Sequence, residues 1–228
     1  MTQLNPYGNN IKEDPAELLE SDRVEQQLSR LIMTMEIPPG AALTQSYLCE
    51  LLQCGRTPLR EAIQRLATDG LIVAVPQRGI SITPLSLTDF IEVQQAELIS
   101  DPACFSLAAQ RITAEELGQL EHILIDADRA IAAGDYGQLA ELHFNYHRIV
   151  GHASGNRHLA KAMNSIHLHG DRFAILAWKQ GAKNAAQTWS EHREMFEALK
   201  AKDPKAAEQK SREHALKSNE RILAALRG

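Results

Sequence analysis

One stretch of sequence decides the fold of the N-terminal part, QCGRTPLREAIQRLATDGLIVAVPQRG at residues 53–79. Thr57 is suited to cap a helix, Pro58 fits the first helical position, and Gly70 supplies a left-handed stop. The stretch therefore predicts a short helix over 58–69. Its apolar residues recur at i, i+3, i+4, i+7 and i+8, the spacing of one buried face: Leu59, Ala62, Ile63, Leu66 and Ala67.

The other face of this helix is polar, and a β-hairpin is expected after it. Arg56, Arg60 and Gln64 project together from the N-terminal part of the helix. Alternating apolar residues then flank a turn at 76–79 that carries Arg78 at its tip: Leu71, Val73 and Val75 before the turn, Ile80 and Ile82 after it. A helix with outward cations followed by a cationic hairpin predicts a winged helix-turn-helix.

Two helices are expected before this recognition helix. The first begins near Asp22 and is ended by the prolines at 38–39; its apolar face consists of Val24, Leu28, Leu31, Ile32 and Met35. Thr44 can cap the second, whose inward residues are Tyr47, Leu48, Leu51 and Leu52. Residues 1–17 have no periodicity and are expected to form a mobile tail.

Past the hairpin the pattern changes to helices without strands. Six helices are expected, over 86–111, 113–134, 135–153, 156–180, 188–202 and 203–226. Pairs with the spacing of capping boxes begin three of them: Ser86 and Asp89, Thr113 and Glu116, Thr188 and Glu191. The sequence thus predicts a mainly α protein with a tail (1–17), a winged helix-turn-helix domain (18–84) and an all-α antiparallel helical bundle (85–228).

Length and composition bound the remaining possibilities. A chain of 228 residues is long enough for two ordinary domains. It has no apolar run near 18 residues and no signal-peptide pattern, so a cytoplasmic protein without a membrane partner is expected. Three cysteines without zinc-type spacing favour reduced thiols. The net charge is −5, so nucleic-acid binding depends on where the arginines lie rather than on bulk charge.

Motifs at several fixed offsets extend over about residues 20–84: PPG at 38–40, LCELL at 48–52, RTPLREA at 56–62, DGL at 69–71 and PQRG at 76–79. Together they resemble the DNA-binding domain of GntR-family transcriptional regulators. Gly55 departs from the family pattern, which usually has Ser or Thr before the arginine.

This resemblance implies recognition of double-stranded operator DNA. Arg56 and Arg60 would reach guanines in the major groove, and Thr57 with nearby backbone amides would hold phosphate. The wing would approach the minor groove. The expected DNA-binding residues are Arg56, Thr57, Arg60, Gln64, Arg78 and Gly79.

Histidines in the helical part are candidate metal ligands. His143 and His147 are spaced i, i+4 and share one helical face. His192 and His214 lie on the inner faces of two further expected helices. Imidazoles from three facing helices could bind Zn²⁺ or Ni²⁺. Hydrogen-bonded core histidines are the ordinary alternative.

A second resemblance bears on this choice. YH at 146–147, ASGN at 153–156, EH at 191–192 and the later His214 resemble the FCD domain, the helical ligand-binding domain of the FadR branch of the family. In that domain an Asp and three His bind a metal, and a small organic acid completes its coordination. His147, His192 and His214 match the three His, while His143 stands at the Asp position. The resemblance therefore favours a divalent metal bound by these four histidines.

The effector pocket departs from the same pattern. Counting back from the frame at 101–109 places Glu97 where the family usually has an inward arginine. An inward acid would repel a carboxylate, whereas a metal held only by neutral imidazoles would attract one. Arg172 is a second pocket candidate, with a surface ion pair as its alternative. His167 and His169 are interpreted as surface or structural groups.

The sequence predicts a ligand-responsive regulator that binds a two-fold operator as a homodimer, and repression is the commoner outcome in this family. The alternative from another class is a helical metal-dependent hydrolase that uses the His143/His147 pair. A zincin needs Glu directly after the first His as general base, and HFNYH at 143–147 has Phe there. An enzyme is therefore not expected.

Overall fold

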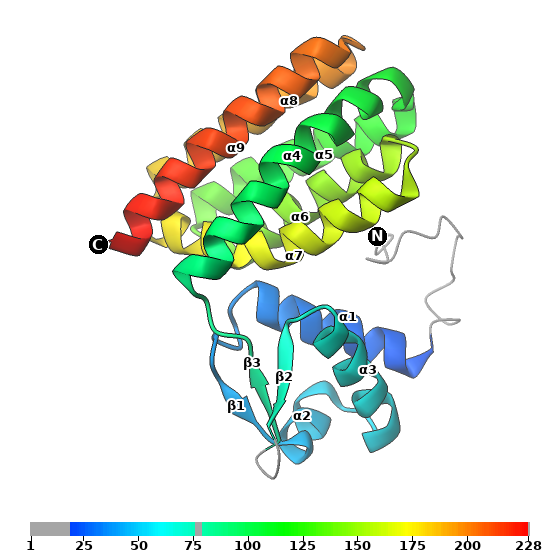
Figure 1. Ribbon diagram of the computed structural model, residues 1–228, viewed down its shortest axis with the longest axis vertical. Coiled ribbons are helices and arrows are strands. Elements are labelled where there is room, and N and C mark those ends of the chain that lie inside the picture. Colours follow the sequence, from blue (N-terminus) through cyan, green and yellow to red (C-terminus); the bar gives the residue numbers. More distant parts are fainter. Residues whose placement is uncertain (1–18, 76–78, 228) are drawn as a thin grey trace. The chain divides into compact units, whose positions relative to one another are not determined.

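The computed structural model describes residues 19–75 and 79–227 of the chain. The chain divides into two compact units between Leu85 and Ser86 (Figure 1). The first unit combines helices with a small sheet, and the second is helical throughout its described residues. The fold class is therefore mainly α, as predicted from the sequence.

The described residues of the first unit form three helices and a three-stranded antiparallel sheet. Its elements are α1 (Glu20–Met33), β1 (Ala42–Leu43), α2 (Gln45–Leu52), α3 (Arg56–Thr68), β2 (Ile72–Val75) and β3 (Gly79–Ile82). The strand order is β1-β3-β2, with Leu43 opposite Ile80 and Ile72 opposite Ile82. The short strand β1 has no period-2 pattern of its own, and for this reason it was not predicted.

The recognition helix α3 begins earlier than predicted. Its N-cap is Gly55 rather than Thr57, so Pro58 occupies the third helical position. Proline is tolerated there because the first-turn N–H groups have no partner within the helix. Four of the predicted core residues are buried, Leu59, Ala62, Ile63 and Leu66, whereas Ala67 is exposed at the edge of the stripe. Gly70 adopts the left-handed conformation predicted for the stop, with φ of 78°.

Three apolar residues of this unit face outward, against prediction. Leu71 and Ile72 are both buried while Val73 is 51% exposed, so Leu71 and Val73 do not share one face as the alternation suggested. Tyr47 and Leu51 of α2 are also exposed, because α2 is short and buries mainly Leu48 and Leu52. Thr44 caps α2 as predicted, accepting a hydrogen bond from the Tyr47 N–H.

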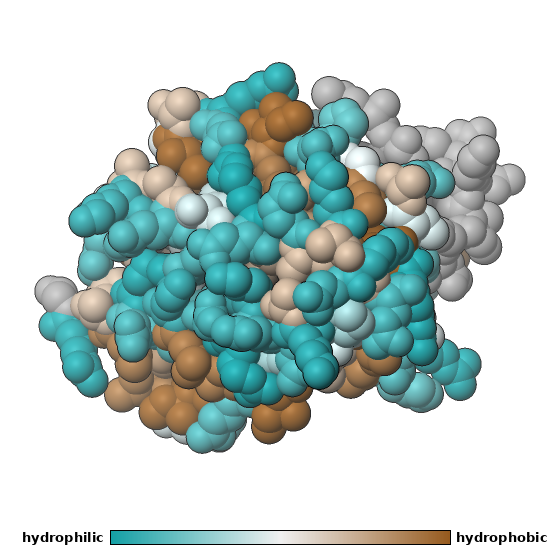
Figure 2. Space-filling view, turned by 90° about the horizontal axis from the view of Figure 1, so that it is seen from above, coloured by the Kyte–Doolittle hydropathy of each residue, from teal (hydrophilic) through white to brown (hydrophobic). Residues whose placement is uncertain are grey.

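The second unit is a bundle of long helices. They are α4 (Leu87–Arg111), α5 (Ala114–Ala133), α6 (Tyr136–Ala153), α7 (Arg157–Lys179), α8 (Ala182–Lys200) and α9 (Pro204–Arg227). Figure 1 shows α9 lying along α4, and α6 packs against α7. Charged and polar residues cover most of the face seen in Figure 2. No helix among residues 19–75 and 79–227 is long and apolar enough to cross a membrane.

Helix α8 corrects one predicted boundary. It begins at Ala182, so Thr188 and Glu191 are interior residues rather than a cap. Helix-favouring residues precede Thr188, and its hydroxyl hydrogen-bonds within the helix to the Asn184 carbonyl oxygen, 3.0 Å away. Both residues therefore lie inside α8 and can contact side chains at the centre of the bundle.

Candidate metal centre and nucleic-acid interface

Four histidines from three helices converge inside the second unit. His143 and His147 come from α6, His192 from α8 and His214 from α9, and all four are at most 5% exposed. One potential ligand atom of each lies within 4.8 Å of those of the others. The structure thus brings together the four residues predicted as metal ligands. The sequence could suggest this because each histidine lies on an inward helical face.

Hydrogen bonds fix the orientation of three of these rings. Nδ1 of His143 lies 2.8 Å from Oδ1 of Asp171, and Nδ1 of His192 lies 2.8 Å from the Thr188 carbonyl oxygen. Nδ1 of His214 lies 2.9 Å from Oε2 of Glu191. Because these oxygens accept hydrogen bonds, each Nδ1 donates, and Nε2 of a neutral ring keeps the lone pair. Such outer contacts are typical of metal-binding histidines.

The fourth ring, His147, has a polar neighbour at each of its two nitrogens but carries only one proton when it is neutral. Its Nδ1 lies 3.2 Å from Oδ2 of Asp101, and its Nε2 lies 3.1 Å from Nε2 of His192. A proton on Nδ1 leaves two lone pairs facing each other across the Nε2 pair. Two nitrogens bound to one tetrahedral Zn²⁺ lie roughly 3.3 Å apart. The observed Nε2 separation therefore fits two ligands of one cation.

The protonation of the cluster suits metal binding. Burial lowers the pKa of His147 and of His192 well below the ordinary histidine value, and the neighbouring imidazoles add to both shifts. Burial also lowers the pKa of His214, although the contact with Glu191 opposes this. These imidazoles are therefore neutral near pH 7, the state that binds a metal. Nε2 of His214 has no hydrogen-bond partner among the described residues.

An acidic group behind the cluster was missed by the sequence analysis. His167, interpreted there as surface or structural, is 3% exposed and lies between two buried aspartates. Its Nε2 is 2.8 Å from Oδ2 of Asp101, and its Nδ1 is 3.5 Å from Oδ1 of Asp171. Burial alone lowers the pKa of His167, but the two carboxylates raise it well above its ordinary value. The i, i+4 spacing of His167 and Asp171 was the only signal in the sequence.

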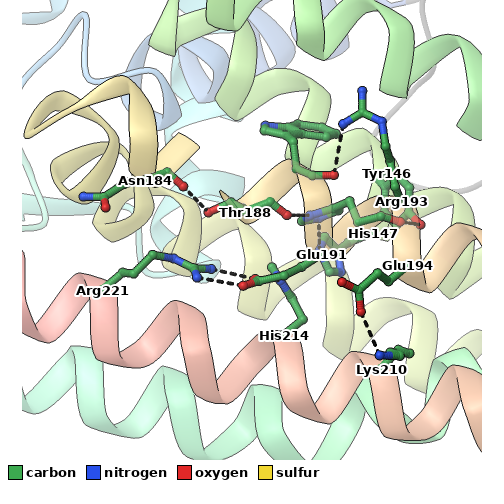
Figure 3. A network of polar contacts seen from close by, with 12 residues as sticks. Tyr146, His147, Asn184, Thr188, Glu191, Arg193, Glu194, Lys210, His214 and Arg221 are labelled. Carbon is green, nitrogen blue, oxygen red and sulfur yellow. Dashed lines mark hydrogen bonds and ion pairs between the residues drawn. The ribbon is translucent and has the colours of Figure 1, made fainter. Parts of the chain in front are cut away.

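Glu191 links the cluster to the C-terminal part of α9. Figure 3 shows Arg221 and Glu191 joined by two parallel contacts, with His214 on the same carboxylate. The two Arg221 nitrogens lie 2.8 and 2.7 Å from the Glu191 oxygens. Burial alone raises the pKa of Glu191, but the hydrogen bonds from His214 and Arg221 lower it to about 2. Glu191 therefore remains ionised, and its charge is compensated by Arg221.

The two predicted pocket residues are both buried. Burial and then the nearby Asp101 raise the pKa of Glu97 to about 8, so this acid is mainly protonated at pH 7. A protonated Glu97 does not repel a carboxylate as the sequence alone suggested. Arg172 is 1% exposed, so the alternative of a surface ion pair is wrong. Burial lowers its pKa to about 10, and Asp89 opposes this shift.

The predicted DNA-binding residues of α3 share an exposed face. Arg56, Thr57, Arg60 and Gln64 are all exposed, opposite the buried stripe. Gly79 begins β3, the middle strand of the three-stranded sheet. Arg78 lies outside the described residues. This face presents two guanidinium groups at the start of a helix, the arrangement that major-groove readers use.

A winged helix-turn-helix joined to a helical unit with a buried histidine cluster defines a DNA-binding regulator with a ligand-binding part. Comparisons with known proteins agree with this class. Residues 20–82 match the bacterial regulatory proteins of the gntR family, and residues 100–217 match the FCD domain. The chain therefore belongs to the GntR family of transcriptional regulators and carries an FCD domain.

Individual relatives are similar over most of their length. The HTH-type transcriptional regulator YdhC of Bacillus subtilis is 29% identical over 80% of this chain and 82% of its own. The HTH-type transcriptional repressor RspR of Escherichia coli is 24% identical over 97% and 92%. The solved structure of E. coli McbR/YncC has the same fold, with a TM-score of 0.82 and 19% identity over 91% and 98%. These relatives are regulators, and the hydrolase alternative has no support among them.

Proposed function

We propose that this regulator binds a two-fold DNA operator as a homodimer in the cytoplasm and acts as a repressor. The proposal of DNA binding rests on the exposed face of α3. Arg56, Arg60 and Gln64 project from this face, and the opposite side of the helix is buried. RspR of Escherichia coli, a transcriptional repressor that is 24% identical over 97% of this chain, supports repression as the sign of regulation.

Substitution of Arg60 tests the DNA-reading face. A bidentate arginine–guanine contact is worth about 1–3 kcal/mol of discrimination, so Arg60→Ala should weaken specific binding about 10- to 100-fold. An operator selected from random duplexes would be titrated by fluorescence anisotropy. Arg129→Ala is the matched control, because Arg129 is an exposed α5 residue that pairs with Asp126. Equal affinities for wild type and Arg60→Ala would contradict this role of α3.

We also propose that His143, His147, His192 and His214 hold a divalent metal, with Zn²⁺ or Ni²⁺ as the best-suited ions. The proposal is supported by the donor set, four buried rings that each offer a ligand atom within 4.8 Å of the others, with the Nε2 atoms of His147 and His192 3.1 Å apart. When bound, the ion supplies positive charge that attracts a small organic acid. Arg172 and protonated Glu97 are the residues proposed to hold the rest of that effector.

The dimer is proposed to form through the helical unit. Helix α4 packs one side against α9 and α7 and leaves large apolar side chains on its outer side. These are Leu87, Ile91 and Ile99, exposed by 57%, 45% and 77%. An outward stripe of this kind on a helix is typical of a protein–protein contact, and a second copy of the chain is the partner that a two-fold operator requires.

A further inference from the structure

Three buried side chains form a bridge behind the histidine cluster, namely Asp101 of α4 and His167 and Asp171 of α7. His167 lies between the aspartates, with one ring nitrogen toward each. Each aspartate also contacts one cluster ring on α6, Asp171 at His143 and Asp101 at His147. All three bridge residues are at most 3% exposed. The bridge therefore connects the two α6 histidines from the side opposite their Nε2 atoms.

Two triads that contain bridge residues also have ligand atoms within 4.8 Å of one another, but each shares a ring with the histidine cluster: Asp101, His147 and His167, and His143, His167 and Asp171. Asp101 and Asp171 face opposite nitrogens of the His167 ring, so both cannot bind an ion held by one of these nitrogens. An ion between Asp101 and His167 would also need Nδ1 of His147. That ring has only one lone pair when neutral, and its Nε2 already faces the cluster. Orientation of the α6 rings is the role that remains.

The geometry of the bridge favours a ligand role for His143. Nδ1 of His143 lies 2.8 Å from Oδ1 of Asp171, so Nε2 is the ring nitrogen that remains to bind an ion. Oδ2 of Asp171 has no hydrogen-bond partner among the described residues.

We propose that Asp171, held in place by His167, is a positioning residue for His143: it fixes the Nδ1–H tautomer and so aims Nε2 at the metal. The inference rests on the metal site proposed above. Asp101 lies behind His147, 3.2 Å from its Nδ1 but without hydrogen-bond geometry, and it holds His167 in place through a 2.8 Å contact with Nε2. The site thus combines four imidazole ligands with acids that lie behind two of them.

A double-mutant cycle between residues 143 and 171 tests this inference. Zn²⁺ affinity would be measured by competition with a chromogenic chelator for wild type, Asp171→Asn, His143→Asp and the double variant. Asp171→Asn should weaken Zn²⁺ binding about 10- to 100-fold, the usual effect of losing such an outer contact. In the His143→Asp background, residue 143 no longer presents a ring to orient, so Asp171→Asn should leave the affinity unchanged or raise it. A purely structural Asp171 predicts the same loss in both backgrounds.

The outcomes separate this inference from the metal site itself. Wild type that binds no Zn²⁺ or Ni²⁺ overturns both proposals. Wild type that binds tightly, with Asp171→Asn equally tight, overturns the positioning role alone. Circular dichroism of the metal-free variants checks folding. If Asp171→Asn does not fold, Asp101→Asn is the second variant. Unchanged Zn²⁺ affinity of Asp101→Asn would also overturn the positioning role of the bridge. Asp126→Asn, on the partly exposed side of α5 and outside the cluster, is the control and should bind like wild type.

Discussion

At the scale of single residues, Gly79 shows why the wing needs a glycine. Its φ is 95°, a conformation that side-chain-bearing residues rarely adopt. A Cβ at this position would overlap the carbonyl oxygen of Leu43, which belongs to the neighbouring strand β1. Gly79 therefore allows β1 and β3 to approach each other.

We expect Gly79→Ala to destabilise the first unit. The positive φ alone costs roughly 1–3 kcal/mol, and the overlap with Leu43 adds to it. Gly40→Ala is the matched control, because Gly40 also has a positive φ, 77°, but nothing within 4 Å of the added Cβ. Urea unfolding followed by circular dichroism would compare the two. A loss no larger for Gly79→Ala than for Gly40→Ala would contradict the close approach.

At the scale of elements, α5 begins with a complete capping box. The Thr113 side chain accepts from the Glu116 N–H at 3.2 Å, and the Glu116 carboxylate accepts from the Thr113 N–H at 2.8 Å. His152 of α6 contacts the same carboxylate at 3.2 Å. The box fixes the start of α5, as the spacing in the sequence predicted, and the His152 contact joins this cap to α6.

The cap should make stability depend on pH. Burial alone raises the pKa of Glu116, but the hydrogen bonds from Thr113 and His152 lower it below its ordinary value. A carboxyl whose pKa is lower in the folded state stabilises the fold above its unfolded pKa, about 4.3, and loses this effect as pH falls through the folded pKa. Glu116→Gln should therefore lower the melting temperature at pH 7, by the equivalent of about 0.3–1 kcal/mol, and this difference should shrink below pH 4.

The control for this experiment is Glu121→Gln, an exposed substitution in the middle of the same helix. It should show a smaller difference from wild type at pH 7. A Glu116→Gln difference that stays constant from pH 7 to pH 3 would exclude an ionised cap as its source.

At the scale of the whole molecule, the metal would connect helices that are distant in sequence. His147, His192 and His214 join α6, α8 and α9, so an ion that binds only the folded state stabilises the bundle as a whole. At a free metal concentration 100-fold above the Kd, this effect is about 2.7 kcal/mol. The histidines are thus expected to act on stability as well as on effector binding.

We expect a chelator to lower the melting temperature of the metal-loaded wild type by several degrees. His192→Ala and His214→Ala should melt at lower temperature without chelator and show no further decrease with it. His152→Ala is the control, because His152 is exposed and outside the cluster. Metal content would be measured by plasma mass spectrometry of protein purified without a histidine tag. If the chelator does not change the wild-type melting temperature, the four histidines form an ordinary polar core without a metal.

The dimer is tested separately by sedimentation. Residues 86–228 form a compact unit and should remain dimeric when expressed without the first unit. In the full chain, Leu87→Glu with Ile91→Glu should produce monomers, because two charges would be placed on the outward stripe of α4. Ile125→Glu is the matched control on α5, where Ile125 is 47% exposed. A dimeric α4 variant would place the interface elsewhere.

The sequence by itself determined the local structure: caps, glycine stops and apolar spacing predicted α3, α4, α5 and the hairpin, and the same spacing placed the four histidines on inward faces. These features depend on neighbours within about four residues, so a sequence pattern contains them. The start of α8 was missed because Thr188 and Glu191 have the spacing of a cap but make other contacts.

Only the tertiary structure decided what surrounds the histidines. Asp101 lies 66 residues from its partner His167, and Asp171 lies 28 residues from His143. The outward phase of Val73 likewise depends on which side of the sheet is covered. Contacts over such separations arise from helix packing, which brings α4, α6 and α7 together, and no local pattern encodes them. The tertiary structure therefore decided that the acids lie behind the four imidazoles.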